Sequence, residues 1–450
     1  MRLVIIGGDA AGMSAASEAR RRAPDAEIVV LEATQDVSYG ACGLPYKLVE
    51  GADVEDLNII SAERFRSERK LDVRLGHRVE ALDASSKTVR GTSDDGPFAI
   101  TYDKLLVATG ATAVRPPIDG FAALWGEGAY TLKTLQDGRD LKAALAEKPR
   151  RAVVVGGGYI GLEATENLKE RGLDVTVVEA LPSLVPFLPE AMRQRVMAEA
   201  KAHGVEVWLD AKVTRGVRSE KGEIVVVTTA GEVVTDVVLV AVGVRPNVLF
   251  AKEAGLALGA GGSISVDDAL RTSVPDVYAA GDCADAKHAV TGKSVWIPLA
   301  LRANRAGKVA GQNMTGGGGV VPGVLGTAVF KFFGLEVARV GLSEDEAREA
   351  GFDVAVAEIT GSTRAHYYPG GGKLSVSLVG DRATGKLLGG CMVGPEGAAH
   401  RIDTVAAALH AGMTADEVYA MDLAYAPPFG PSWSPLLIAA SALGKAMKKR

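Results

Sequence analysis

The sequence is poor in cysteine, lacks long apolar runs and has no excess of basic residues. Its three cysteines, Cys42, Cys283 and Cys391, are widely separated and form no C-x-x-C pair, so neither a disulfide framework nor a zinc site is indicated. No stretch approaches the roughly 18 apolar residues that a membrane span requires. The formal net charge of -5 offers no attraction to nucleic acid or to an anionic membrane. We therefore expect a soluble, cytoplasmic protein without metal, nucleic-acid or membrane partners.

Glycine, in contrast, is abundant, and it is concentrated in two turns of similar pattern. A chain of 450 residues is too long for one hydrophobic core, so two or three domains are expected. Residues 2–32 contain an apolar strand, the turn GGDAAG, a helix and a second strand that ends in Glu32. Residues 151–179 repeat this order with the turn GGGYIG and a final Glu179. A βαβ nucleotide-binding unit is therefore predicted twice.

The second turn has the strict G-x-G-x-x-G spacing, formed by Gly156, Gly158 and Gly161. These glycines permit a tight turn, let the backbone approach a pyrophosphate and allow close helix–strand packing. Glu179 can bind a ribose 2′-hydroxyl and would repel a 2′-phosphate, and no basic residue follows it in 180–182. We interpret this unit as an NADH site, with NADPH possible if a basic side chain reaches it from elsewhere. A purely structural glycine turn is the alternative.

The first turn, residues 7–12, departs from the strict spacing because Asp9 stands where the second glycine belongs. Glu32 nevertheless closes the unit in the proper place, and two such units suggest two dinucleotides, one of which could be FAD. The segment 272–282, TSVPDVYAAGD, supports this hypothesis. A strand that ends in Gly-Asp places the Asp282 carboxylate where it can bind a ribityl hydroxyl. An ordinary strand and turn is the alternative.

The remaining pattern suggests how the chain is divided. Residues 1–113 and 247–320 are expected to form one nucleotide-binding domain, which is split by a second domain at 114–246. The glycine run at 316–319 is a natural linker. Strand-like runs and helices then alternate through 326–450, which predicts an α+β module. We expect the terminal KAMKKR to be only a solvated end.

Four separated motifs resemble those of the pyridine nucleotide-disulfide oxidoreductases over essentially the whole length of the chain. They are GGDAAG with Glu32, VATGA at 107–111, GGGYIG with Glu179 and YAAGD at 278–282. The resemblance implies an α/β fold with two Rossmann-like domains, the FAD domain being split by the NAD domain. It also implies a C-terminal α+β dimerisation domain and therefore a homodimer.

The resemblance further implies which residues contact the cofactors FAD and NADH. Tyr159 would gate the nicotinamide pocket beside the flavin. The full set of implied cofactor contacts is Gly7, Gly8, Ala11, Gly12, Glu32, Val79, Thr109, Gly110, Lys133, Gly156, Gly158, Tyr159, Ile160, Gly161, Glu179, Gly243, Gly281, Asp282, Leu299 and Ala300.

Cys42 lies in the stretch SYGACGLPY, and it has no partner cysteine. Relatives that form an internal disulfide need C-x4-C, whereas position 47 here is lysine. A lone cysteine must instead cycle as a sulfenic acid or as a mixed disulfide with a small thiol. Flanking glycines and a helix that we expect to begin here would stabilise its thiolate. A buried structural cysteine is the alternative, and it is the interpretation preferred for Cys283 and Cys391.

The same stretch looks most like the single-cysteine coenzyme A-disulfide reductase branch, which includes NADH oxidases, NADH peroxidases and persulfide reductases. Residues 365–370 and 424–428 resemble the C-terminal motifs of that branch, in which tyrosines of the partner subunit approach the cysteine. A phenol can donate a hydrogen bond to a thiolate or a proton to a departing one, which makes Tyr367 and Tyr425 catalytic candidates. Either could equally be a packed aromatic, and Tyr368 could substitute for Tyr367.

Basic and polar side chains grip the nucleotide phosphates of coenzyme A in that branch, so the resemblance implies a substrate site. A solvated helix face is an equally open interpretation of the basic positions. The matching residues are Ser14, Arg21, Ser38 and Lys70. The positions that depart from the pattern are Ala41, Asn304 and Trp433.

Our leading hypothesis is an FAD-dependent enzyme that passes a hydride from NADH through FAD to Cys42 and then to a small disulfide or persulfide, such as coenzyme A disulfide. An NADH oxidase that reduces oxygen to peroxide or water is the second hypothesis. The peroxidase interpretation is weaker, because Ala10 stands where a histidine is expected. A flavin-loaded redox sensor without turnover is the third.

Overall fold

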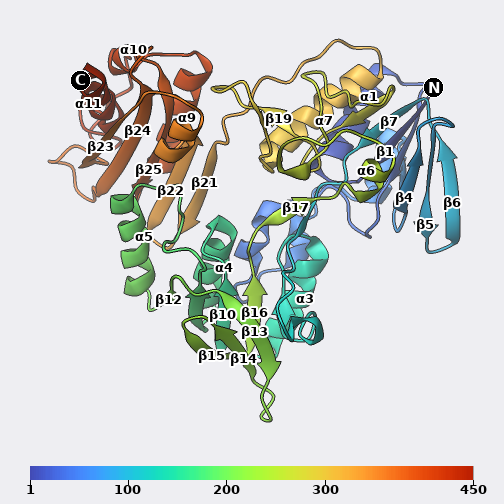
Figure 1. Ribbon diagram of the computed structural model, residues 1–450, viewed down its shortest axis with the longest axis horizontal. Coiled ribbons are helices and arrows are strands. Elements are labelled where there is room, and N and C mark those ends of the chain that lie inside the picture. Colours follow the sequence, from blue (N-terminus) through green and yellow to red (C-terminus); the bar gives the residue numbers. More distant parts are fainter. Residues whose placement is uncertain (449–450) are drawn as a thin grey trace.

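The computed structural model describes residues 1–448, and they form three regions (Figure 1). The first region combines blue segments from the start of the chain with yellow segments from around residue 300. The second region, in teal and green, lies between those segments in the sequence. The third, in orange and red, contains the C-terminal part. The structure therefore has the mixed α/β architecture that the sequence predicts.

The first region is built on a five-stranded parallel sheet. Strand β1 lies in its centre, and the side chains of Leu3, Val4 and Ile5 are completely buried, as expected for a strand covered on both faces. A strand from beyond the second region completes the sheet. In spatial order the strands are β18 (Val277–Ala279), β7 (Lys104–Val107), β1 (Arg2–Ile6), β2 (Glu27–Leu31) and β3 (Asp72–Arg74).

Two helices pack closely on this sheet because small residues face each other. A Cβ on Gly307 or on Gly311 would overlap the backbone of Ala11 or of Ala15, respectively. The helices are α1 (Ala10–Arg22) and α7 (Ala300–Met314). The smaller elements of the region are α2 (Ala62–Arg69), β4 (Arg78–Asp83), β5 (Thr88–Ser93), β6 (Gly96–Thr101), β8 (Ala111–Ala113), β17 (Val244–Pro246), α6 (Leu249–Glu253), β19 (Ala286–Lys287) and β20 (Ser294–Val295).

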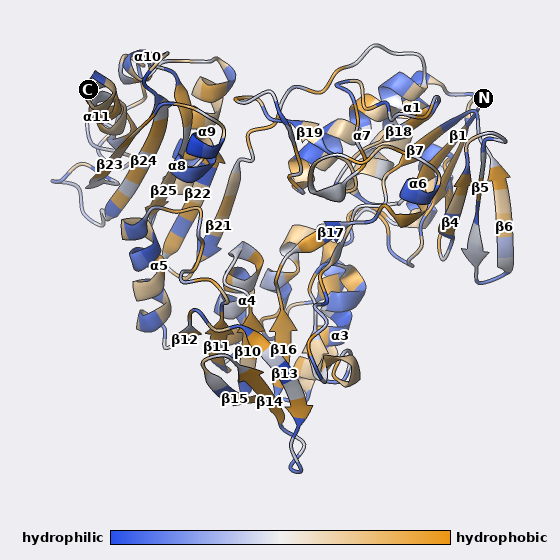
Figure 2. Ribbon diagram, in the orientation of Figure 1, coloured by the Kyte–Doolittle hydropathy of each residue, from blue (hydrophilic) through white to orange (hydrophobic). Residues whose placement is uncertain are grey.

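The second region repeats the βαβ arrangement around another five-stranded sheet, whose central strands are strongly hydrophobic in Figure 2. The strands in spatial order are β12 (Glu206–Trp208), β11 (Asp174–Val178), β10 (Arg151–Val155), β16 (Val237–Val240) and β9 (Ala129–Tyr130). A three-stranded sheet is formed by β13 (Val213–Arg218), β14 (Ile224–Thr228) and β15 (Gly231–Thr235). The helices are α3 (Leu135–Ala146), α4 (Tyr159–Glu170) and α5 (Glu190–Ala202).

The third region is an antiparallel sheet with helices. In spatial order its strands are β21 (Ala328–Phe332), β22 (Leu335–Gly341), β25 (Leu387–Gly394), β24 (Lys373–Asp381) and β23 (Val354–Ser362). The helices are α8 (Glu344–Glu349), α9 (Ala398–His410), α10 (Ala415–Tyr419) and α11 (Pro435–Lys448).

Helix α11 corrects the expectation that KAMKKR is only a solvated end. The helix continues through Lys448, and Leu436, Ala440 and Leu443 are buried on one face at helical spacing. Met447 packs against the same cluster. The last two residues of the motif lie outside the described part of the chain.

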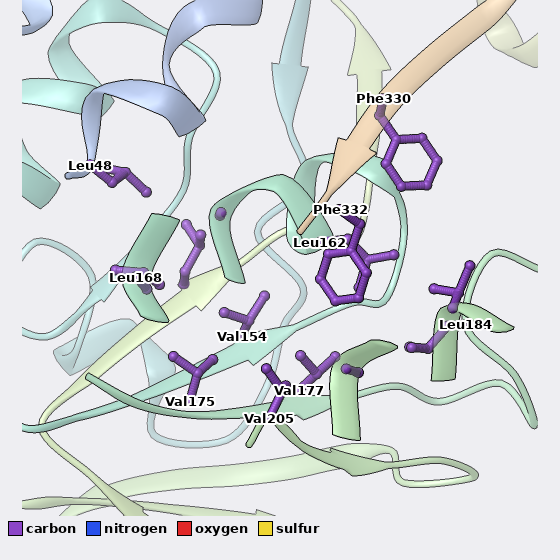
Figure 3. Packing of buried hydrophobic residues seen from close by; sticks show 14 of the residues in the cluster. Leu48, Val154, Leu162, Leu168, Val175, Val177, Leu184, Val205, Phe330 and Phe332 are labelled. Carbon is purple, nitrogen blue, oxygen red and sulfur yellow. The ribbon is translucent and has the colours of Figure 1, made fainter. Parts of the chain in front are cut away.

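The second and third regions share a hydrophobic core. Figure 3 shows Phe330 and Phe332 of β21 beside Leu162 of α4, and Phe332 is completely buried. The buried Glu166 of α4 accepts a hydrogen bond from the backbone N–H of Phe333 at 2.7 Å. The two regions are therefore joined by apolar packing as well as by a polar contact. Within residues 1–448 no helix combines the length and apolarity needed to cross a bilayer.

Candidate active site

A cleft of about 2340 Å³ extends from the first βαβ unit to α4 and the third region. Pockets for single small ligands usually measure about 300–1,000 Å³, so this cleft has room for a dinucleotide and a substrate together. It brings many of the predicted residues to one place. Those that line it are Gly7, Gly8, Ala11, Ser14, Arg21, Glu32, Ser38, Cys42, Val79, Thr109, Gly110, Lys133, Tyr159, Ile160, Gly281, Asp282, Leu299 and Ala300.

The two glycine turns have nearly the same geometry. Gly7 and Gly156 have φ of 106° and 109°, which favours glycine because a Cβ would be strained there. The backbone N–H of Gly8 donates to Glu32 at 2.7 Å, and that of the residue after Gly156 donates to Glu179 at 2.6 Å. Each carboxylate is thereby fixed at the end of its strand. The turn of the first unit faces the cleft and fits the pyrophosphate of a dinucleotide such as FAD.

The third glycine of each turn has a packing role. A Cβ on Gly12 would overlap the carbonyl oxygen of Gly7, and one on Gly161 would overlap that of Gly156. Both glycines are buried, so they allow the helix to approach the strand rather than lining the cleft. The sequence pattern predicted this close packing correctly.

The predicted residues of the second turn lie outside the large cleft. They follow β10, β11 and β16, at the carboxyl ends of neighbouring parallel strands, which is where dinucleotides bind in such sheets. They are Gly156, Gly158, Gly161, Glu179 and Gly243. Tyr159 and Ile160, at the start of α4, connect this turn to the cleft.

Asp9 replaces the second glycine of the first turn without blocking the cleft. Its carboxylate accepts a hydrogen bond from the backbone N–H of Tyr39 at 3.3 Å. Gly8 accepts another from the N–H of Ser38 through its carbonyl oxygen. Asp9 therefore ties the glycine turn to the segment that carries Cys42. Burial raises the pKa of Asp9 to about 6, a property that the sequence pattern did not indicate.

Cys42 is exposed to the cleft, but no α-helix begins there. The expectation of a stabilising helix dipole is wrong, because residues Ala41–Gly43 form only one 3-10 turn, which has too few aligned peptides for a substantial dipole. Although Cys42 is open to the cleft, the surrounding protein partly removes water from its thiol and so raises its pKa above the usual value, whereas the nearby Lys133 opposes that shift. Lys133 is thus the group that favours the thiolate.

Lys133 is itself held by an ion pair with Asp282, whose carboxylate lies 3.1 Å from its ammonium. Burial disfavours the charge on Lys133, but the attraction of Asp282, together with those of Asp9 and Cys42, outweighs that effect and raises the pKa of Lys133. The pair joins two segments that the sequence predicted separately. Lys133 therefore keeps its positive charge beside Cys42 at neutral pH.

Two residues near Cys42 were missed by the sequence interpretation. Tyr46 donates a hydrogen bond from its hydroxyl to Glu163 at 2.7 Å. Glu163 lines the cleft one helical turn after Tyr159. Spacing along the helix could have suggested Glu163, because residues four apart share a helix face. The contact with Tyr46 joins the first and second regions, so only the tertiary structure reveals it.

Among the predicted substrate residues, Lys70 does not line the cleft. Helix α2 ends at Arg69, and Lys70 has the left-handed backbone of the helix C-cap. Its carbonyl oxygen accepts a hydrogen bond from Arg20 at 2.7 Å. Arg69 lines the cleft instead and donates to the hydroxyl of Ser17 at 2.7 Å. The sequence interpretation thus chose the neighbour of the residue that lines the cleft.

Tyr367 and Tyr425 do not line the cleft of their own chain. Their hydroxyl oxygens are 2.8 Å apart, and their exposed fractions are 63% and 48%. The structure therefore brings the two predicted tyrosines together although 58 residues separate them. Phe429 and Trp433 are also exposed in this part of the chain.

Comparisons with known proteins define the class. The family model described as pyridine nucleotide-disulphide oxidoreductase matches residues 1–307, and the model of its dimerisation domain matches residues 327–435. The chain belongs to this family. It is therefore an oxidoreductase that uses FAD and a pyridine nucleotide, as the two nucleotide-binding units predicted.

The relatives of this chain are named as three kinds of oxidoreductase. The chain is 39% identical over 444 residues to an NAD(P)H coenzyme A polysulfide/persulfide reductase of Pyrococcus horikoshii, covering 98% of each. It is 36% identical over 446 residues to an NADH oxidase of Methanocaldococcus jannaschii, again covering 98% of each. It is 31% identical over 438 residues to a coenzyme A disulfide reductase of Staphylococcus aureus, covering 95% of this chain and 96% of the relative.

A solved structure of similar fold is an NAD-dependent persulfide reductase from A. fulgidus. Its TM-score is 0.93 at 37% sequence identity, and the match covers 98% of this chain and 82% of that one. The predicted family and its single-cysteine branch therefore agree with these comparisons.

Proposed function

We propose that this protein is an NADH-dependent reductase of a small disulfide or persulfide, with Cys42 as its redox group. The observation that carries the proposal is the isolation of Cys42 in the cleft. Among the described residues, the other two cysteines are buried and free: Cys283 donates to the carbonyl of Val107, and Cys391 contacts Met192. Neither cysteine can form a disulfide with Cys42, so the sulfur that pairs with Cys42 must come from a substrate.

In this proposal the Cys42 thiolate attacks a disulfide R–S–S–R, forms Cys42–S–S–R and releases RS⁻, which takes up a proton. FAD, held by the first glycine turn, would pass the two electrons of NADH to the mixed disulfide, which yields the Cys42 thiolate and RSH. Lys133 favours the attacking thiolate by its charge, and Asp282 holds Lys133 in place. Tyr159 lies at the cleft beside these groups and would cover the nicotinamide pocket.

The acidic end of β11 supports NADH as the electron donor. Glu179 is fixed by hydrogen bonds from the N–H groups of Gly157 and Leu181, at 2.6 and 2.8 Å. A carboxylate held in this place suits a ribose 2′-hydroxyl and repels a 2′-phosphate. Residues 180–182 provide no positive charge.

A basic wall of the cleft supports a phosphate-bearing thiol such as coenzyme A. Arg21 and Arg69 line the cleft from the first region, together with Ser14 and Ser38. Arg305 of α7 also lines it, although the sequence interpretation did not select it. Guanidinium groups bind phosphates through paired hydrogen bonds, so this wall could hold the phosphates while the sulfur reaches Cys42.

The exposed tyrosine pair supports a homodimer with a shared active site. Tyr367 and Tyr425 belong to the region matched by the dimerisation-domain model, and neither reaches the cleft of its own chain. In a dimer they would approach the partner's cysteine, where a phenol could donate a hydrogen bond to a departing thiolate. The free cysteines fit a reducing cytoplasm.

Replacing Cys42 with serine tests the function. We expect NADH-dependent reduction of coenzyme A disulfide or of a persulfide to fall at least about a thousandfold, because a hydroxyl cannot replace the nucleophilic thiolate. Reduction at a rate near wild type would contradict the proposal. Mass spectrometry of the unreduced protein would identify the thiol attached to Cys42.

NADH oxidase activity is a second candidate, favoured by the relative of that name. Oxygen uptake measured beside disulfide turnover separates the two. Without any disulfide, an oxidase would consume one NADH per oxygen molecule if it forms peroxide, or two NADH per oxygen molecule if it forms water. Negligible NADH consumption with every acceptor would favour a sensor without turnover.

A further inference from the structure

One face of α4 carries three residues that are each held by another part of the protein. Tyr159, Glu163 and Glu166 follow at helical spacing and so share this face. The Tyr159 ring lies 6.5 Å from that of Phe330 on β21, measured between centroids. Glu163 accepts the hydrogen bond from Tyr46, and Glu166 is fixed to the third region. Glu163 therefore has a defined position at the junction of the regions.

Glu163 is the member of this face that is poised to titrate near neutral pH. Its carboxyl lines the cleft together with Cys42 and Lys133. Burial raises its pKa to about 7, the charge of Glu166 acts in the same direction, and the Tyr46 hydroxyl opposes both. Glu166 is itself paired with a lysine of β21, Lys331, whereas Glu163 forms no ion pair within residues 1–448.

Four charged groups act on the Cys42 thiol. Lys133 favours the thiolate, whereas Glu163, Asp282 and Asp9 oppose it, with Glu163 the strongest of the three. Asp282 is paired with Lys133, whereas the Glu163 carboxyl is held by the hydroxyl of Tyr46 at 2.7 Å, four residues after Cys42 in the sequence. Of the three carboxyl groups, Glu163 is therefore the one whose change of charge has the largest effect on Cys42.

We propose that Glu163 and Cys42 are coupled by charge: a proton on the Glu163 carboxyl favours the Cys42 thiolate, and the Glu163 carboxylate favours the neutral thiol. The inference rests on the proposed function, in which the thiolate is the reacting form. Glu163 sets the charge beside Cys42 and, when protonated, holds the proton that the departing thiolate takes up. Tyr46 has no direct part in the chemistry and holds the carboxyl in place.

The coupling gives the exchange step a local source of protons. Attack of the thiolate on R–S–S–R forms the Cys42–S–S–R bond, breaks the substrate S–S bond and releases RS⁻. Cys42 then no longer carries a negative charge, so the pKa of Glu163 falls. The proton leaves the Glu163 carboxyl and is taken up by RS⁻, which gives RSH and a carboxylate. Charge and protons balance without another reactant.

The test is the pH dependence of Cys42 alkylation in the flavin-loaded, thiol-reduced enzyme. Iodoacetamide labels the thiolate, and mass spectrometry of the Cys42 peptide gives the rate. Wild type should show a curve shallower than a single titration, because Glu163 ionises in the same range. Glu163→Gln should restore a single titration at lower pH and label about tenfold faster at neutral pH, since one pKa unit changes the thiolate fraction tenfold.

A second variant, Tyr46→Phe, tests the same coupling without changing Glu163. The test therefore still works if Glu163→Gln does not fold. Loss of its hydrogen bond should raise the pKa of Glu163, so labelling at neutral pH should increase, by less than in Glu163→Gln. The double variant should match Glu163→Gln alone. Glu170→Gln, an exposed change on the same helix, is the matched control and should leave the curve unchanged.

An unchanged curve in Glu163→Gln with a native flavin spectrum would overturn the coupling while leaving Cys42 as the redox group. Slower labelling in that variant would also overturn it. A Cys42 that is not labelled at any pH in wild type would contradict the proposed function itself. The two failures are therefore distinguishable.

Discussion

The ammonium of Lys133 lies 3.1 Å from the carboxylate of Asp282, and this pair sets the positive charge that faces Cys42. Lys133 follows β9 of the second region, and Asp282 follows β18 of the first. The reactivity of the cysteine thus depends on the assembly of two regions. Its immediate neighbours in the sequence do not supply the charge.

Replacing Lys133 with methionine should make Cys42 less reactive. Loss of the positive charge removes the interaction that lowers the thiol pKa, so that pKa should rise. We expect alkylation at neutral pH to slow about tenfold, corresponding to about one pKa unit. Lys293→Met, which changes an exposed lysine that also lines the cleft, is the control. Faster labelling in Lys133→Met would show that the assigned sign is wrong.

Glu166→Ala should weaken the junction between the second and third regions. The change leaves the N–H of Phe333 and the ammonium of Lys331 without their carboxylate. An unsatisfied buried donor costs about 1–3 kcal/mol, so we expect about 2 kcal/mol lower stability in urea unfolding. Glu170→Ala, exposed on the same helix, should change stability by less than about 0.5 kcal/mol. If the two variants lost the same amount of stability, Glu166 would not stabilise the junction between the second and third regions.

Glu179→Ala combined with Ala180→Arg should shift the enzyme from NADH towards NADPH. The first change removes the carboxylate that repels a 2′-phosphate, and the second supplies a guanidinium to attract it. We expect the ratio of kcat/KM for NADH over NADPH to fall at least about tenfold, a difference of about 1.4 kcal/mol. A ratio that stayed constant would place the adenosine ribose elsewhere.

Asp9→Asn should stabilise the holoenzyme at neutral pH. Burial raises the folded-state pKa of Asp9 from 3.8 to about 6, so the folded state binds more protons between these values. Wild type should therefore gain stability as pH falls through that window, whereas Asp9→Asn should not. Asparagine can still accept the hydrogen bond from Tyr39. Above the window we expect the variant to be about 3 kcal/mol more stable, since one pKa unit corresponds to about 1.4 kcal/mol.

Thermal unfolding measured on both sides of the window checks this prediction. The difference between the variant and wild type should shrink as the buffer is acidified from about the folded pKa to the unfolded one. A difference independent of pH would mean that the raised pKa of Asp9 does not contribute. A less stable variant at neutral pH would mean that the negative charge is needed.

Several features could be predicted because they depend on short-range spacing. The glycine turns, with Glu32 and Glu179 closing their units, are encoded within about thirty residues each, and the local geometry follows from backbone sterics. The lack of a C-x4-C partner for Cys42 could be predicted in the same way, whereas its separation from Cys283 and Cys391 is shown only by the fold.

The sequence alone determined the two nucleotide-binding units, the single cysteine of the cleft and the family. The tertiary structure decided which charges reach that cysteine. Tyr46 and Glu163 are 117 residues apart, and Arg69 replaces Lys70 because of where α2 ends. Electrostatic effects depend on distance and burial, and neither can be read from spacing along the chain when the contacts cross between regions.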